Sequence, residues 1–211
     1  MDILKSIFGI MSPIEILGSI LGIVNVYLIT RRSILNWPVG IAMTLLYTWI
    51  FFDAKLYSDV LTQLFFTVVQ VIGWMQWQKA KDDTSDIRVT NQSLASFSVV
   101  CSMTVIGAFG WGYLMATHTD AAMPYPDAAI LAASVTGQFL LNFRKYEAWF
   151  YWICVDIVGI PVYYIKGLYP TTVLYCIFLV LAIVGLIKWI RVWRVGLKED
   201  AETNRLLKEI N

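Results

Sequence analysis

The sequence is poor in the residues that build metal centres and covalent catalytic sites. Its 211 residues include one histidine, His118, and three cysteines. A single imidazole in a polar segment argues against a multi-histidine metal site and against a Ser-His-Asp triad. The cysteines lie inside apolar runs without CxxC spacing, which excludes a disulfide framework and a zinc site. We therefore expect no metal, no cofactor and no catalytic residues.

Charged residues are also scarce. They make up 15% of the chain, whereas hydrophobic residues make up 58%. A soluble domain has about 25% charged and about 45–50% apolar residues, so this chain has too few polar side chains to cover a water-facing surface. The composition excludes an ordinary soluble enzyme, a disordered chain and a nucleic-acid-binding protein. It indicates an all-α integral membrane protein that lies in a lipid bilayer.

Apolar runs of membrane-crossing length recur along the chain. A helix needs roughly 20 mostly apolar residues to cross the hydrocarbon core. Seven runs approach this length, which predicts seven transmembrane helices. Residues 193–211 form a polar tail, which is expected to be a frayed, water-exposed helix from residue 195 onward. The runs cover residues 13–30, 37–52, 57–77, 95–115, 127–142, 146–165 and 171–192.

The positions of lysine and arginine predict the orientation in the membrane. Of the 16 basic residues, only Lys5, Lys55 and Lys166 fall on the side of the N-terminus when seven spans are counted. Loops rich in Lys and Arg stay in the cytoplasm. The N-terminus is therefore expected outside, and the C-terminal tail is expected in the cytoplasm.

The chain also contains an internal repeat. A constant shift of 112 residues along the sequence, without gaps, superposes identical tryptophan and glycine residues of its two halves. This repeat shift carries Trp37 onto Trp149, Gly73 onto Gly185, and Trp77 onto Trp189. It carries the first three spans onto the last three and leaves the fourth unmatched.

The repeat predicts a 3+1+3 arrangement. Residues 13–77 form a first three-helix bundle, residues 95–115 a linking helix, and residues 127–192 a second bundle. The extra helix gives both bundles the same orientation. Parallel repeats of this kind occur in transporters such as the sugar-carrying SWEET proteins, so the substrate is expected between the bundles near the membrane midplane.

Polar and aromatic residues gather at similar depths within the spans. A carboxylate at mid-bilayer costs several kcal/mol, so Asp156 needs a polar cavity or a substrate contact. The alternative is a structural hydrogen bond to Thr44 or to a tyrosine. Amides in the membrane either join helices or bind a ligand. The candidate substrate-binding residues are Gln63, Phe66, Gln70, Gln138, Asn142, Trp149, Trp152 and Asp156.

This set of side chains suits a flat aromatic ligand that carries hydroxyl groups and a positive charge. Indole faces attract cations, amides hydrogen-bond to hydroxyls, and a carboxylate balances the charge. A further group of tryptophans near the span ends is interpreted mainly as anchors at the membrane interface. This group contains Trp37, Trp74, Trp77, Trp189 and Trp193.

Several motifs resemble the PnuC family of bacterial vitamin transporters over about residues 13–192. In the first half they are Leu56-Tyr57-x-Asp59, Gln63, Phe66, Gln70 and Gly73-Trp74-x-x-Trp77. In the second half they are Arg144-Lys145-Tyr146-x-x-Trp149-x-x-Trp152-x-x-x-Asp156 and Lys166-Gly167-Leu168-Tyr169. Some relatives carry asparagine at the position of Asp156.

The resemblance implies facilitated diffusion of nicotinamide riboside across the bacterial inner membrane, followed by trapping through a cytoplasmic kinase. It implies that the substrate is held by Phe66, Gln70, Gln138, Asn142, Trp149 and Trp152. Thiamine is the nearest alternative, because it is also cationic, aromatic and hydroxylated. A membrane enzyme would need a cluster of reactive residues, and a structural protein would tolerate loss of the amides. The sequence does not decide between a monomer and a homo-oligomer.

Overall fold

A computed structural model describes the chain except for residues 1–12, 54, 56, 85–86 and 211. The described part contains seven helices, which confirms the all-helical fold predicted from the apolar runs. The helices are α2 (Pro13–Thr30), α3 (Asn36–Asp53), α4 (Tyr57–Thr84), α5 (Leu94–His118), α6 (Pro124–Asn142), α7 (Ala148–Ile165) and α8 (Tyr169–Ile210).

Five of the described helices are long and apolar enough to cross a membrane along one continuous stretch. The two helices that are less apolar are α3 and α6. Helix α3 carries Trp, Tyr and Thr residues, and α6 begins with Pro-Tyr-Pro-Asp and carries Gln138 and Asn142. Polar and aromatic side chains lower the mean hydropathy of these two helices.

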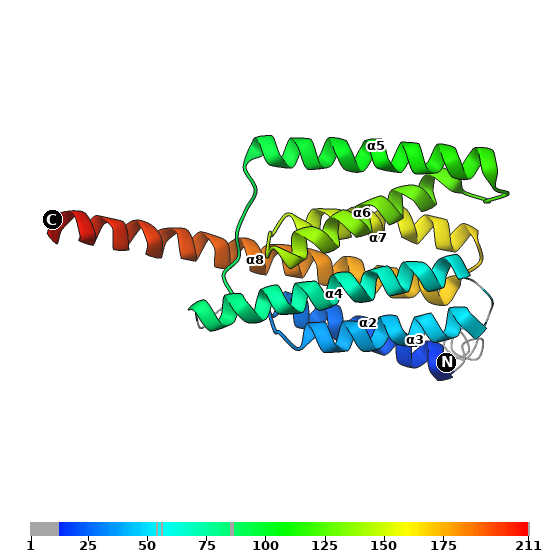
Figure 1. The fold of residues 1–211 in the computed structure, drawn as a ribbon, viewed down its shortest axis with the longest axis horizontal. Helices are drawn as coiled ribbons and strands as arrows, with labels where there is room; N and C mark the ends of the chain where they lie inside the picture. Colours follow the sequence, from blue (N-terminus) through cyan, green and yellow to red (C-terminus); the bar gives the residue numbers. More distant parts are fainter. Residues whose placement is uncertain (1–12, 54, 56, 85–86, 211) are drawn as a thin grey trace.

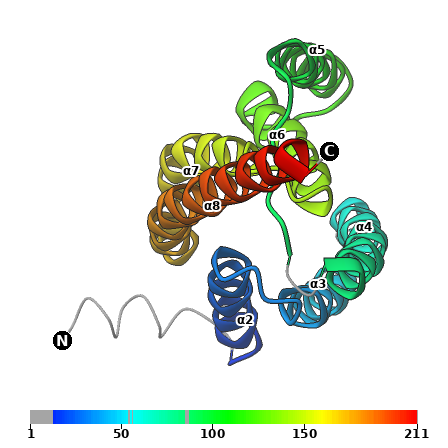
Figure 2. The same ribbon diagram turned by 90° about the vertical axis from the view of Figure 1, so that its left-hand side faces the viewer.

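Six of the helices surround a common axis (Figure 2). Helices α2, α3 and α4 pack in sequence, and α6, α7 and α8 do the same. The two bundles meet where α4 packs on α6 and where α2 packs on α8. The repeat shift exchanges these two contacts, because it carries α2 to α6 and α4 to α8.

Helix α5 lies outside this arrangement and packs mainly against α6 (Figure 2). Its N-terminus is capped by Ser93, whose side chain accepts a hydrogen bond from the Ser96 amide at 3.2 Å. Gly112 is the one buried residue of α5, and the Tyr125 ring of α6 lies against it. The remaining apolar surface of α5 is available to lipid.

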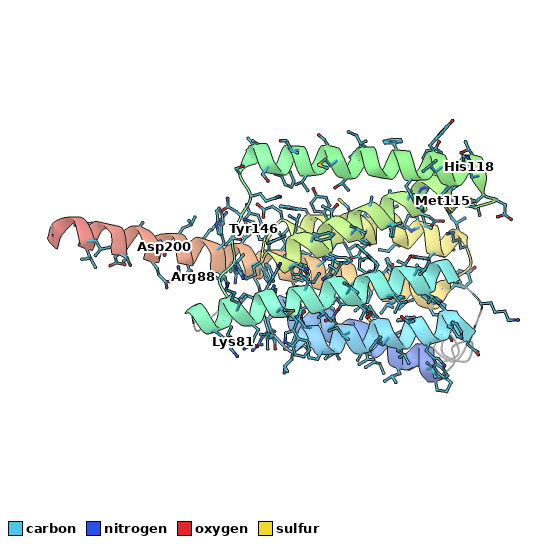
Figure 3. All side chains as sticks on the ribbon, viewed as in Figure 1. Lys81, Arg88, Met115, His118, Tyr146 and Asp200 are labelled. Atoms are coloured by element: carbon cyan, nitrogen blue, oxygen red, sulfur yellow. The ribbon has the colours of Figure 1, made fainter. Side chains whose placement is uncertain are left out.

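Helix α8 extends well past the other helices towards the C-terminus (Figure 1). We call the end of the bundle from which α8 projects the tail side. The predicted span ends at residue 192, and the helix continues without a break through the polar tail, predicted to be helical, to Ile210. Arg88 forms an ion pair with Asp200 of this extension at 3.1 Å, and both residues lie on the tail side (Figure 3).

The connection between α4 and α5 packs across the tail side of the second bundle. Thr90 forms an isolated parallel bridge with Lys145 in the α6–α7 turn. The Thr90 amide donates to the Arg144 carbonyl at 3.0 Å, and the Tyr146 amide donates to the Thr90 carbonyl at 3.1 Å. Ile87 is buried in the same connection. The linking segment is thus attached to the second bundle.

Two arginines attach the same region to the first bundle. Arg32 donates from Nη1 to the Ile87 carbonyl at 2.7 Å. Arg144 donates from Nη1 to the Gln76 carbonyl at 3.4 Å, and burial lowers the pKa of its guanidinium below the usual value. The turns of both bundles are therefore held together on the tail side.

These two arginines also occupy the same place in the two halves of the repeat. Arg32 has φ 54° and Arg144 has φ 58°. The Arg32 amide donates to the Ile29 carbonyl, and the Arg144 amide donates to the Leu141 carbonyl, both at 2.9 Å. The same tight helix-to-helix turn therefore recurs at the matching position of the second half. The likeness of the whole arrangement to SWEET proteins stays a prediction.

Candidate functional site

The largest fully buried side chains in the described part of the chain are four tryptophans at the tail side of the bundles. We call them the tryptophan quartet. Their exposed fractions are at most 2%, so the interpretation of Trp37, Trp77 and Trp189 as interface anchors is wrong. Trp74 is 38% exposed and remains compatible with that role. The quartet consists of Trp37, Trp77, Trp149 and Trp189.

The indoles of the quartet form a continuous chain between the bundles. Trp37 meets Trp77 edge-to-face at a centroid distance of 5.3 Å, and Trp149 meets Trp189 in the same way at 5.7 Å. Trp77 and Trp189 lie 5.9 Å apart and join the two halves. Edge-to-face contacts of this kind are favourable beyond the area that they bury.

Hydrogen bonds of the quartet also cross between the bundles. Trp77 of α4 donates from Nε1 to the Leu141 carbonyl of α6 at 3.1 Å. Trp189 of α8 donates from Nε1 to the Ile29 carbonyl of α2, also at 3.1 Å. Each acceptor lies near the end of its helix, where carbonyl groups lack a partner within the helix. The tail side is therefore closed by two matching contacts.

Glycine makes room for the quartet. A Cβ atom at Gly185 would lie 2.5 Å from the Trp149 ring. A Cβ atom at Gly73 would meet the Trp37 ring and would lie 2.6 Å from Asn142 Oδ1. Any larger residue at these positions must displace an indole that is already fully buried.

Replacing Gly73 by alanine is therefore expected to destabilise the protein by about 1–3 kcal/mol, the usual effect of overpacking. The measurement is thermal unfolding in detergent. Gly107 is the control, because nothing lies within 4 Å of the Cβ atom that an alanine would add there. Equal unfolding midpoints for the two alanine variants would contradict the close packing at Gly73.

Three buried amides lie beside the quartet, and we call them the amide layer. Gln138 donates from Nε2 to Asn142 Oδ1 at 3.2 Å, within α6. Asn142 donates from Nδ2 to the Val69 carbonyl of α4 at 3.0 Å, which joins the two bundles. The third amide belongs to Gln70, which follows Val69 on α4. All three residues of the layer are at most 8% exposed.

The Gln70 amide lies against the first bundle. It donates from Nε2 to Thr44 Oγ1 at 3.5 Å, and its Oε1 lies in the space that a side chain at Gly40 would fill. Thr44 in turn lies 2.8 Å from the Thr67 hydroxyl. Gln70 is seven residues from Trp77, or about 10 Å along the helix. The polar layer therefore begins where the quartet ends.

Helix α7 contributes the remaining candidates of the second bundle. Trp149 is buried in the quartet with no hydrogen-bond partner on Nε1 in the described structure, and Trp152 is half-buried against Gly137. Asp156 is 3% exposed. No hydrogen bond from its side chain to Thr44 or to a tyrosine is present among the described residues.

Two sequence candidates on α4 lie further from the tail side than Gln70. Gln63 and Phe66 lie on α4 and are half-buried. Gln63 is seven residues from Gln70, about 10 Å further from the tail side. The Leu56-Tyr57-x-Asp59 motif lies in part outside the described residues, so its side chains are not placed.

Sequence reasoning missed one polar residue near the layer. Asn25 of α2 has a buried Oδ1 without a hydrogen-bond partner in the described structure. Its signal was an amide in the interior of an apolar span, but no spacing connected it with the other amides. Asn25 lies near Gln70 because α2 and α4 both pack against α3, where both side chains approach Gly40.

A ring of membrane-crossing helices with polar side chains inside is the architecture of a small-molecule transporter. The chain belongs to the nicotinamide mononucleotide transporter family, whose model matches residues 12–191. This match confirms the recognition made from the motifs. The family consists of transporters, which also confirms that the chain is not an enzyme.

Similarity to individual proteins covers most of the chain. The nicotinamide riboside transporter PnuC of Escherichia coli is 22% identical over 205 residues, with 85% of this chain and 86% of the relative covered. The riboflavin/roseoflavin transporter RibM of Streptomyces davaonensis is 26% identical over 178 residues, with 83% of each covered. The crystal structure of the vitamin B3 transporter PnuC matches with a TM-score of 0.74 at 22% identity, covering 92% of this chain and 86% of that one.

Proposed function

We propose that this chain mediates facilitated diffusion of nicotinamide riboside across the bacterial inner membrane. The observation that carries the proposal is the amide layer of Gln70, Gln138 and Asn142, which both bundles contribute and which lies beside buried indoles. Family membership supports the transport of a vitamin-like small molecule. The relatives named for nicotinamide riboside support the choice of substrate.

The chemistry of the site supports a cationic nucleoside. The pyridinium ring suits the indole of Trp152, because indole faces attract cations. The Asp156 side chain is 3% exposed, so a bound cation gives its carboxylate a counter-charge. Gln70 and Gln138 supply amide groups for the ribose hydroxyls. A neutral flavin, the substrate named for RibM, gains nothing from this carboxylate.

Transport by rocking of the two bundles fits the position of the contacts between them. The Trp77–Leu141 and Trp189–Ile29 hydrogen bonds close the tail side. The clustering of lysine and arginine supports a cytoplasmic location for that side. Opening towards the cytoplasm then requires both bonds to break. A cytoplasmic kinase that phosphorylates the riboside prevents its return, because the added anionic phosphate does not fit a site that binds a cation.

Titration of the purified protein with nicotinamide riboside, thiamine and riboflavin tests the choice of substrate. Calorimetry is expected to detect saturable binding of the riboside and weaker binding of the other two. Tight binding of thiamine with no signal from the riboside would transfer the proposal to thiamine. Tight binding of riboflavin alone would contradict the role of Asp156.

Replacing Gln138 by leucine is expected to weaken binding of nicotinamide riboside about ten- to a hundredfold. The reason is the loss of a buried amide partner, which corresponds to roughly 1–3 kcal/mol. The matched control is Thr136→Val on the same helix, because the Thr136 hydroxyl bonds to Thr104 of α5, away from the amide layer. An equal loss of affinity in both variants would show that any polar change in α6 disturbs the site.

A further inference from the structure

An amide of α2 that no sequence motif singles out lies at the inner face of the first bundle. Asn25 Nδ2 is 3.1 Å from the position of a Cβ atom on Gly40 of α3, and Gln70 Oε1 of α4 occupies the same space. Because side chains of both α2 and α4 approach Gly40, this glycine lies on the face of α3 that is turned towards both of these helices. Asn25 therefore points to the side of α3 that faces the common axis of the bundles.

The amide of Asn25 has unused bonding capacity. Its Oδ1 is buried and has no hydrogen-bond partner in the described part of the structure. A buried acceptor without a partner costs about 1–3 kcal/mol, so it needs a compensating role. The neighbouring Gln70 differs, because its Nε2 donates to Thr44.

The repeat places an indole at the corresponding point of the second bundle. The repeat shift carries Asn25 to Gly137 and Gly40 to Trp152. In the second bundle the Trp152 indole lies against Gly137, with Nε1 3.3 Å from the position of a Cβ atom there. In both bundles a side chain of one helix therefore lies against a glycine of the next helix. In the first bundle α2 provides the side chain and α3 the glycine, whereas in the second bundle α7 provides the side chain and α6 the glycine.

We propose that Asn25 is a further substrate-binding residue, whose Oδ1 accepts a hydrogen bond from a hydroxyl or amide N–H of a bound nucleoside. Trp152 of the second bundle covers the aromatic ring, and Asn25 of the first bundle reads the polar edge opposite. The inference rests on the proposed function, since Trp152 is a substrate contact only under that function. It adds α2 to the helices that recognise the substrate.

The test compares Asn25→Leu, which keeps the size of the side chain and removes the acceptor, with wild type. Calorimetry with nicotinamide riboside is expected to show a loss of affinity of about ten- to a hundredfold. Thermal unfolding without ligand is expected at the same temperature or higher, because a partnerless buried acceptor is removed. Thr136→Val is the control and should bind like wild type.

Three results would overturn the inference. Unchanged affinity of Asn25→Leu, with wild type binding the riboside, would remove Asn25 from the site and leave the proposed function intact. A lower unfolding midpoint with unchanged ligand-induced stabilisation would assign Asn25 a structural role. If wild type binds none of nicotinamide riboside, thiamine and riboflavin, the proposed function fails and the inference fails with it.

Discussion

Replacing Trp77 by alanine is expected to lower the free energy of unfolding by about 3–5 kcal/mol, the usual cost of emptying a buried tryptophan site. The variant loses two indole contacts and the Nε1 hydrogen bond to the Leu141 carbonyl, which keeps its bond from the Arg144 amide. Trp189→Ala should lose a similar amount, because it occupies the same place in the other half and donates to Ile29. Thermal or denaturant unfolding in detergent measures both values.

The control for this prediction lies on the same helix. Trp74 is 38% exposed, so Trp74→Ala should change stability far less than Trp77→Ala. If the Trp74 variant is destabilised as strongly as the Trp77 variant, the quartet does not hold the bundles together. Because Trp77 and Trp189 are in contact, the double variant should lose less than the two single losses combined.

The conservative variant Trp77→Phe tests whether Trp77 closes the tail side of the bundles, independently of its role in the stability of the fold. It keeps a smaller aromatic ring in the quartet and removes the hydrogen bond to the Leu141 carbonyl. We expect a small loss of stability, about 1 kcal/mol, together with faster labelling of a cysteine introduced at the tail side. Unchanged labelling would contradict the assignment of this bond to the closed state.

Replacing Asp156 by asparagine is expected to weaken binding of cationic nicotinamide riboside about ten- to a hundredfold, or roughly 1.4–2.7 kcal/mol. The variant keeps the shape of the side chain and removes its charge. The ligand-free variant should unfold at a higher temperature than wild type. The reason is that a carboxylate buried in a membrane domain without a partner is costly.

The reduced, uncharged form of nicotinamide riboside is the matched ligand for this test. Asp156→Asn should bind it as wild type does, since the lost interaction is with the positive charge. An equal loss of affinity for the charged and the uncharged forms would show that Asp156 supports the site sterically. Calorimetry with both ligands on both proteins gives the four affinities that the comparison needs.

The order of the helices could be predicted from the sequence because hydrophobic length is a local property. The run at 13–30 has the bounds of α2, and the other runs differ from their helices mainly at the ends. The largest difference is in α8, where helix formation continues into the polar tail. A hydropathy pattern records where the chain leaves the lipid, and it does not record where the helix ends.

The candidate site could be predicted only in part. Gln70, Gln138 and Asn142 were recognised as inward-facing because an amide in lipid lacks hydrogen-bond partners. The same rule applies to Asn25, but its neighbours come from α3 and α4 rather than from its own helix. Its relation to Gln70 depends on which faces of three helices meet, and no spacing along one helix encodes that.

By itself, the sequence determined the class of protein, the helix order and the repeat, because all three follow from composition and from matches at one constant offset. The tertiary structure decided what the tryptophans do. Trp37, Trp77 and Trp189 lie near the ends of the spans predicted from hydropathy, where an indole serves equally well as an interface anchor or as a packing residue. Their complete burial follows from the approach of the two bundles at Gly73 and Gly185, and from carbonyl acceptors that only the opposite bundle provides.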